Sequence, residues 1–218
     1  IASLFAGSPK GTHTAANTGR WSKLDYAVRL TAVLSNLAYR QGDRIGLAAL
    51  SGDTQQVIPL GSGEQHWSNI LLELARLKPS NRFPSKEMMG AVLSSVQKPG
   101  LILFISDFFD YKDETLSFVR SLAGAGSDVA AIQLESADEA SFPYKGAVRF
   151  EDAETGEEVL VSAQTARETY LNARESAQTT LRDKLLERGI ELTTLSIDGP
   201  LDSALADFLK QRTRAAGA

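Results

Sequence analysis

The chain of 218 residues has no cysteine and only two histidines, His13 and His66. The lack of cysteine excludes a disulfide framework, catalysis by a thiol, and zinc or iron–sulfur sites with cysteine ligands. Two histidines are too few for a metal site built from several imidazoles. The sequence also lacks any apolar run near the roughly 18 residues that a membrane-spanning helix needs. We therefore expect no membrane span within this chain.

A basic block is missing as well. The chain has 23 Lys and Arg residues against 27 Asp and Glu residues, a formal net charge of −4. Phosphate neutralisation needs clustered basic side chains, so nucleic acid is excluded as a partner. Hydrophobic residues make up 43% of the chain, enough for one folded domain over residues 1–218. The sequence opens at Ile1 rather than Met, which leaves open an upstream membrane anchor.

Helical and strand patterns alternate along most of the sequence. Residues 1–21 are expected to be a mobile N-terminal segment, because 7–20 are rich in Gly, Ser, Thr and Asn without an apolar period. Helices are predicted at about 22–41, 64–77, 85–97, 112–125, 163–188 and 201–213, and strands at 43–50, 55–60, 101–106, 128–134 and 190–197. This alternation predicts a three-layer α/β sandwich with a mostly parallel sheet.

The most apolar stretch is Leu101–Ser106, whose composition is typical of a central strand covered on both faces. Asp107 follows at its carboxyl end. In open α/β sheets the functional crevice lies outside the carboxyl ends of the strands. We therefore expect the loops 3–7, 80–85 and 106–110 to gather at one edge and form the site.

Residues 135–162 interrupt the alternation. Two strand patterns at 144–150 and 157–161 flank the acidic turn 152–156, which ends in Gly156. This arrangement predicts a β-hairpin. We expect it to be an accessory hairpin at the edge of the sheet.

Five stretches, in this order and spacing, resemble the von Willebrand factor A-like domain of the bacterial proteins called domain-of-unknown-function family 58. They are Ser-Leu-Phe-Ala-Gly-Ser at 3–8, Lys-Leu-Asp-Tyr-Ala at 23–27, Arg-Gln-Gly-Asp-Arg-Ile-Gly-Leu at 40–47, Leu-Phe-Ile-Ser-Asp-Phe at 103–108 and Asp-Ala-Glu-Thr-Gly-Glu at 152–157. The resemblance covers nearly the whole chain and implies a Rossmann-like von Willebrand factor A-type fold.

Such domains are similar to integrin I domains, in which a metal-ion-dependent adhesion site binds Mg²⁺. That site uses an Asp-x-Ser-x-Ser motif, a Thr from a second loop and an Asp from a third. The resemblance assigns Ser3 to the last Ser of the motif, Ser85 to the hydroxyl of the second loop and Asp107 to the third-loop Asp.

The sequence departs from this motif in two places. Ile1 stands at the middle Ser, and the first Asp would precede it. The second loop has Arg82 and Phe83 in place of the usual Thr. One matched carboxylate is a poor ligand set for Mg²⁺, so the site is expected to be degenerate and to bind Mg²⁺ weakly or not at all.

In the family that the chain resembles, the domain is often encoded beside MoxR-type AAA+ ATPases. The resemblance therefore implies a non-enzymatic adaptor for a protein partner, cytoplasmic or tethered to the membrane through residues outside this chain. We expect Arg82, Phe83 and Phe108 to contact that partner, because aromatic and Arg side chains are enriched at interfaces.

The alternative is a metal-dependent hydrolase or phosphotransferase that uses Asp107 and Asp110. Against it, the sequence has no Gly-rich phosphate loop, no G-x-G-x-x-G and no G-x-S-x-G motif. No catalytic residue is assigned, and no resident cofactor is expected.

Overall fold

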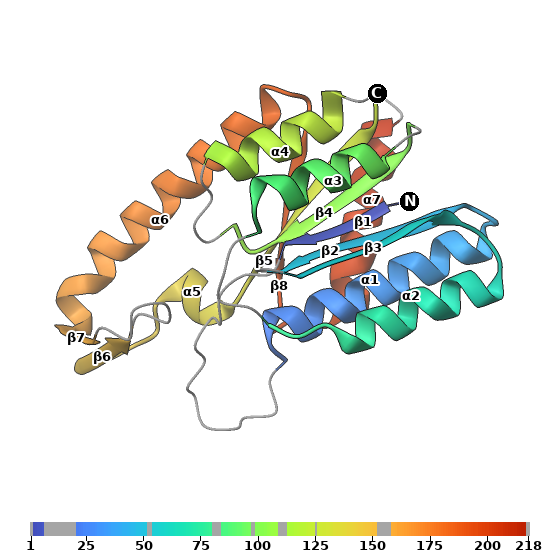
Figure 1. Ribbon diagram of the computed structural model, residues 1–218. Helices are drawn as coiled ribbons and strands as arrows, with labels where there is room; N and C mark the ends of the chain where they lie inside the picture. Colours follow the sequence, from blue (N-terminus) through green and yellow to red (C-terminus); the bar gives the residue numbers. More distant parts are fainter. Residues whose placement is uncertain are drawn as a thin grey trace.

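The structure is a computed structural model that describes residues 2–6, 21–51, 54–79, 84–96, 99–108, 113–124, 126–151 and 158–216. Figure 1 shows a twisted sheet between two layers of helices. The order of the six strands is β3-β2-β1-β4-β5-β8. Their bounds are β1 Ala2–Ala6, β2 Ile45–Ser51, β3 Thr54–Gly61, β4 Leu101–Ser106, β5 Asp128–Glu135 and β8 Glu191–Ser196. Only β3 is antiparallel to its neighbour in this sheet.

The helices cover both faces of the sheet. One face packs against α3 (Lys86–Ser95), α4 (Asp113–Gly124) and the end of α6 (Ala163–Leu186). The other face packs against α1 (Lys23–Arg40), α2 (Glu64–Arg76) and α7 (Leu201–Ala216). This arrangement confirms the expected fold class, a three-layer von Willebrand factor A-type α/β sandwich with a mostly parallel sheet.

Strand β4 lies in the centre of the sheet, as predicted. Its side chains alternate between the two apolar layers, so Phe104 contacts the layer of α3 and α4 while Leu103 and Ile105 contact the layer of α1 and α7. Phe104 and Ile105 are fully buried. A parallel strand with helices on both sides needs apolar residues at successive positions, which explains the uninterrupted apolar sequence.

The position of β1 corrects one expectation. Residues 2–6 do not belong to a mobile segment, since they form the strand between β2 and β4. Ser3 pairs with Leu47 on one side and Leu103 on the other, so it lies within a strand and not in a loop at the sheet edge. The short apolar sequence of β1 fills the gap in a parallel sheet, a long-range effect that local composition does not reveal. Of the rest of the segment that was expected to be mobile, Ile1 and residues 7–20 lie outside the described residues.

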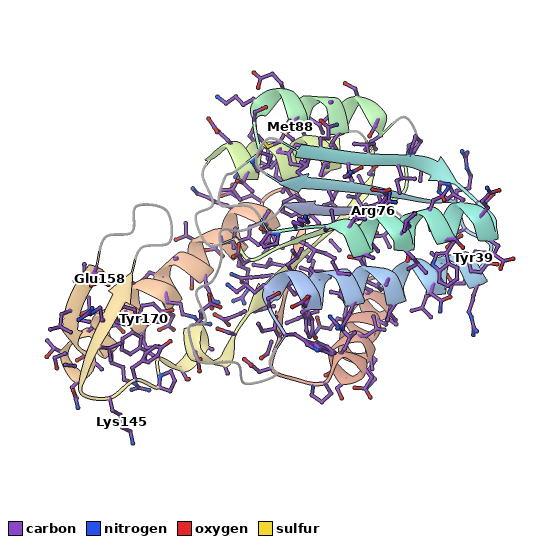
Figure 2. All side chains as sticks on the ribbon, turned by 60° about the horizontal axis from the view of Figure 1, so that its bottom comes forward. Tyr39, Arg76, Met88, Lys145, Glu158 and Tyr170 are labelled. Carbon is purple, nitrogen blue, oxygen red and sulfur yellow. The ribbon has the colours of Figure 1, made fainter. Side chains whose placement is uncertain are left out.

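The expected β-hairpin is present, but its location differs from the expectation. Strands β6 (Ala147–Glu151) and β7 (Glu158–Ser162) form a separate two-stranded antiparallel sheet. In Figure 1 this hairpin lies at the far end of α6, away from the edge of the main sheet. It packs through aromatic rings of Phe142, Phe150 and Tyr170, and Figure 2 shows Tyr170 beside it. The short helix α5 (Ala137–Ser141), which was not predicted, precedes it.

The hairpin lies away from the edge of the main sheet because of the way α6 packs. Only its C-terminal turns reach the core, where Leu181 and Leu185 are buried. The N-terminal turns project from the sheet and hold the hairpin. None of the helices in the described parts of the chain combines the length and apolar character that a bilayer crossing demands.

Candidate functional site

The candidate site begins where β4 ends, at the carboxyl edge of the sheet. The hydroxyl of Ser106 accepts a hydrogen bond of 3.1 Å from the backbone N–H of Phe108. This bond closes a tight turn around Asp107 and holds Phe108 at a φ of 51°, in the left-handed region that bulky residues rarely adopt. The turn directs the Asp107 side chain into the site, where it is only 7% exposed.

A polar network fixes the backbone of Asp107. The side-chain amide of Gln133 on β5 donates to the Asp107 carbonyl at 3.3 Å. The hydroxyl of Thr194 on β8 in turn donates to the amide oxygen of Gln133 at 3.2 Å. Three neighbouring strands are therefore linked at their carboxyl ends, and the position of Asp107 is determined before any ligand arrives.

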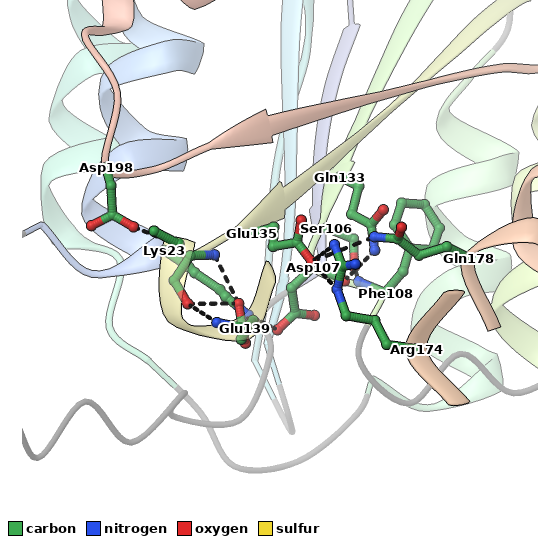
Figure 3. Close-up of polar contacts among 12 residues, drawn as sticks. Lys23, Ser106, Asp107, Phe108, Gln133, Glu135, Glu139, Arg174, Gln178 and Asp198 are labelled. Carbon is green, nitrogen blue, oxygen red and sulfur yellow. Dashed lines mark hydrogen bonds and ion pairs between the residues drawn. The ribbon is translucent and has the colours of Figure 1, made fainter. Parts of the chain in front are cut away.

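Lys23, the first residue of α1, lies between two carboxylates (Figure 3). Its ammonium nitrogen is 2.6 Å from Oε1 of Glu139 and 3.5 Å from Oδ2 of Asp107. The Lys23 side chain is 12% exposed, so this charge is largely removed from water. The structure thus holds a positive charge beside the carboxylate that the resemblance assigned to a metal.

Glu139 is positioned by a capping box at the start of α5. Its Oε2 accepts hydrogen bonds from the backbone N–H of Ser136 at 2.8 Å and from the Ser136 hydroxyl at 3.0 Å. Burial by itself raises the pKa of Glu139, but the charge of Lys23 and the hydrogen bonds from Lys23 and Ser136 outweigh it. The pKa of Glu139 therefore lies below its usual value, and the carboxylate stays ionised beside Lys23.

A second ion pair lies across the site. Arg174 on α6 binds Glu135 at the end of β5 through Nε, at 2.7 Å, and through its terminal nitrogen. Gln178, one helical turn further, donates to the same carboxylate oxygen at 3.4 Å. The pair fastens the projecting part of α6 to the sheet edge.

A cavity of about 260 Å³ separates α6 from the sheet edge at these two ion pairs. Phe108 and Leu181 contribute apolar walls, and Ala173 and Tyr170 line the side of α6. The Tyr170 hydroxyl donates to the backbone carbonyl of Glu139 at 3.0 Å. Burial, followed by the charge of Glu139, raises the pKa of Tyr170, so this hydroxyl remains a neutral donor.

The three predicted metal ligands lie in different kinds of position in the structure. Asp107 lies at the sheet edge as expected. Ser85 is the N-cap of α3, and its hydroxyl accepts from the backbone N–H of Met88 at 3.3 Å. Ser3 lies inside β1 and not in an edge loop. Within the described ranges, no group of three or more His, Asp or Glu side chains could hold a metal ion.

The predicted partner contacts need one correction. Phe108 is only 4% exposed and packs 5.5 Å from the ring of Phe104, centroid to centroid, so it is not on the rim. The tight turn after Ser106 directs it into the core. Arg82 and Phe83, and also Asp110 of the enzyme alternative, lie outside the described residues.

The sequence reasoning did not find Lys23, Glu139, Glu135 or Arg174. A local signal exists for Glu139, because Ser136 followed by Glu139 has the spacing of a capping box. No local signal exists for the Lys23–Glu139 pair, whose members are 116 residues apart.

Comparison with known sequences gives relatives along most of the chain. The model of the family described as "Protein of unknown function DUF58" matches residues 9–180. The uncharacterized proteins Rv1480 of Mycobacterium tuberculosis and Mb1516 of Mycobacterium bovis are each 24% identical over 201 residues. These alignments cover 89% of this chain and 62% of each relative. The chain therefore spans less than two thirds of the length of these curated relatives.

Two solved structures share the fold over nearly their full length. An aerotolerance-related membrane protein from Bacteroides fragilis superposes with a TM-score of 0.59 at 15% identity, covering 98% of this chain and 97% of that one. The conserved hypothetical protein BatB from Bacteroides thetaiotaomicron gives a TM-score of 0.57 at 12% identity, covering 100% and 98%. At these identities the likeness concerns the fold alone.

Proposed function

The chain belongs to the family described as protein of unknown function DUF58, and from this membership we propose that it is a non-enzymatic interaction domain working with a MoxR-type AAA+ ATPase. In this proposal the carboxyl edge of the sheet binds a protein partner without a bridging metal. The observation that carries it is Lys23, whose ammonium group lies between Asp107 and Glu139.

In this proposal the ammonium group of Lys23 takes the place of a divalent metal ion. At a metal-ion-dependent adhesion site, a divalent ion balances the charge of the carboxylates and offers an open position to a partner. A divalent ion bound at Asp107 would lie close to the Lys23 ammonium, and unit charges 4 Å apart repel by about 4 kcal/mol at an effective dielectric constant of 20. Mg²⁺ also needs near-octahedral geometry and releases its water reluctantly. The site is therefore proposed to be a degenerate one.

The partner is proposed to enter the cavity beside this ion pair. Its volume, about 260 Å³, suits one or two side chains of a partner protein. Apolar walls from Leu181 and Tyr170 surround a floor of paired charges, which is the combination found at interface cores and their rims. Arg82 and Phe83 remain proposed contacts from the neighbouring loop.

The enzyme alternative has no supporting observation in the described residues. Asp107 is ion-paired with Lys23, so it is not poised as a nucleophile or as a ligand for a catalytic metal.

We also propose that the domain works at the cytoplasmic face of a membrane, tethered by segments outside this chain. Two facts support this: the curated relatives are longer than the aligned region, and one neighbour in structure is named as a membrane protein.

The metal part of the proposal is tested by calorimetric titration with Mg²⁺ and Mn²⁺. We expect the chain to show no binding below millimolar concentration, because Lys23 competes with the ion. Lys23→Ser should strengthen metal binding at least tenfold, and adding Asp107→Ala should remove the gain. Micromolar binding by the unchanged chain, lost in Asp107→Ala, would contradict the proposal.

The partner part is tested by measuring the affinity for a MoxR-type ATPase with a blocked cavity. Ala173→Phe places a ring into the cavity, whereas Asn172→Phe adds the same ring on an adjacent position of α6 that does not line it. We expect Ala173→Phe to weaken binding at least tenfold and Asn172→Phe to leave it within twofold. Equal affinities for the two variants would contradict the proposed surface, and turnover of phosphoester or ester substrates by the unchanged chain would contradict the non-enzymatic role.

A further inference from the structure

The β6–β7 hairpin carries large apolar side chains that are exposed. Leu160 is 69% exposed and Val159 is 57% exposed, although both lie in a regular strand. Among the residues that the structure describes, strand β7 pairs with β6 alone, because these two strands form a sheet of their own. Two-stranded sheets are marginally stable in water, and an open strand edge readily accepts a further strand.

The hydrogen-bond pattern shows which backbone groups lie on the open edge of β7. The N–H of Ala163 donates to the carbonyl of Gly146 at 2.8 Å, which continues the β6–β7 ladder by one position. In antiparallel sheets, residues alternate between bonding to the partner strand and facing away from it. Val159 and Val161 therefore bond to β6, whereas Glu158 and Leu160 direct their backbone groups to the open edge. Ser162 directs its N–H to the same edge, while its carbonyl, at the N-cap of α6, serves the first turn of that helix.

We propose that β7 pairs with β7 of a second copy of this chain, antiparallel and centred on Leu160. The two hairpins then form one four-stranded sheet in the order β6-β7-β7-β6 with a twofold axis. Each Leu160 lies opposite the Leu160 of the partner subunit, so this side chain, 69% exposed in one copy, becomes covered. This proposal does not depend on the function proposed above, since it concerns a different surface.

The sequence of β7 is self-complementary in this register. Glu158 lies opposite a serine, Ser162 of the partner subunit, so the carboxylates avoid each other, and Val159 lies opposite a valine. A register centred on Glu158 would instead place two carboxylates opposite each other, which is destabilising. In the register centred on Leu160, each of the three edge-facing residues lies opposite an edge-facing residue of the other copy. If the centre moves by one residue, to Val159 or Val161, one of the three has no opposite residue within β7.

Charge along the hairpin favours the same antiparallel arrangement. Figure 2 shows Glu158 and Lys145 at opposite ends of the hairpin, and Glu158 also pairs with Arg149 of its own hairpin at 3.1 Å. An antiparallel pair brings the acidic end of one copy to the basic end of the other. The location also permits the contact, because the hairpin lies at the outer end of α6, away from the main sheet (Figure 1).

The interface is small, and this sets the expected affinity. Stable dimers bury about 1,200–2,000 Å² in total, more than two short strands with a few apolar side chains provide. We therefore expect a weak, concentration-dependent dimer, with a dissociation constant of roughly 10–500 μM.

The first test is sedimentation of the 218-residue chain over a concentration series up to about ten times the upper end of that range. Leu160→Lys should make the chain monomeric at all concentrations. Leu186→Lys is the matched control, because Leu186 is a similarly exposed leucine (64%) at the other end of α6, and it should leave dimerisation unchanged. A chain that stays monomeric at every concentration overturns the proposal. That is also the result expected if the edge of β7 binds a strand of a different protein. A dimer that persists in Leu160→Lys overturns it as well.

The second test determines the register and uses the absence of cysteine from the chain. Directly opposite residues that bond across an antiparallel pair have Cα atoms about 5.5 Å apart, within the range for a disulfide. Under mild oxidation Leu160→Cys should form a disulfide-linked dimer, and Leu186→Cys should not. Glu158→Cys and Ser162→Cys should cross-link when mixed but not separately. If Glu158→Cys alone forms a disulfide-linked dimer and Leu160→Cys does not, the register centred on Leu160 is wrong.

Discussion

Strands β4 and β7 are both apolar, yet their surroundings are opposite. β4 has a paired strand on each side and a helical layer on each face, and Phe104 is fully buried. In the described part of the chain β7 has one paired strand, and Leu160 is mostly exposed. Apolar composition therefore predicts that a segment forms a strand, but the number of neighbours decides whether the strand is core or surface. In this protein the two cases lie at opposite ends of α6, whose C-terminal turns pack on the core and whose N-terminal turns carry the hairpin.

The sharpest test of this difference is truncation of one apolar side chain in each strand. Phe104→Ala should lower the free energy of unfolding by about 3–5 kcal/mol, because it leaves a cavity in the centre of the fold. Val159→Ala should lower it by less than about 0.5 kcal/mol, because its side chain is already largely in water. Urea denaturation followed by circular dichroism measures both, at a concentration where the chain is monomeric. A loss below about 1 kcal/mol for Phe104→Ala would place β4 outside the core.

A smaller effect is expected at the ion pairs that end β4. Lys23→Met should lower the free energy of unfolding by about 1–2 kcal/mol, less than the 3–5 kcal/mol for fully buried pairs, because Glu139 is partly exposed. Lys23→Arg keeps the charge and serves as the control, with a smaller loss. An unchanged or higher stability of Lys23→Met at neutral pH would contradict this role of the ion pair.

The same pair gives a pH dependence with a definite sign. Since the pKa of Glu139 is lowered in the folded state, its stabilisation is fully present above the unfolded value of about 4.3. It is lost as the pH falls from there through the lower folded pKa. We expect the stability of the unchanged chain to fall more steeply in that range than the stability of Lys23→Met. Parallel curves for the two proteins would show that Glu139 gains nothing from Lys23.

The parts of the fold that depend on local patterns could be predicted from the sequence. The helix α1 begins at its capping box of Ser22 and Asp25, and β4 is identified by its apolar run. β1 was missed because its five residues precede a polar stretch, and only the gap between β2 and β4 makes them a strand. The hairpin was found from its turn, but its location depends on where α6 docks.

The candidate site, too, has residues that a local pattern predicts and residues that only the fold brings together. Asp107 was predicted because it directly follows a central strand, whereas Ser85, expected to be a second-loop ligand, is the N-cap of α3. The ammonium group of Lys23 was not predicted, because its partners come from β4 and α5, far away in the sequence. The expected partner contact of Phe108 was wrong because the local turn at Ser106 directs its ring into the core. Side-chain pairs between distant elements are the part that a single sequence does not specify.

The smallest effect is expected at the tip of the hairpin, and it tests whether the hairpin is independent of the core. Four residues of Gly and Ser inserted between Ala153 and Gly156 should change the free energy of unfolding by less than about 0.5 kcal/mol, because the loops of hairpins usually accept insertions. The physical reason is that closing a somewhat longer loop adds little entropy cost, and β6 and β7 can keep their register. The same four residues inserted between Leu103 and Phe104 are the control and should abolish folding, because they shift every later residue of a central strand. If the insertion at the tip also abolishes folding, the hairpin is part of the folding core and the contrast between β4 and β7 does not hold.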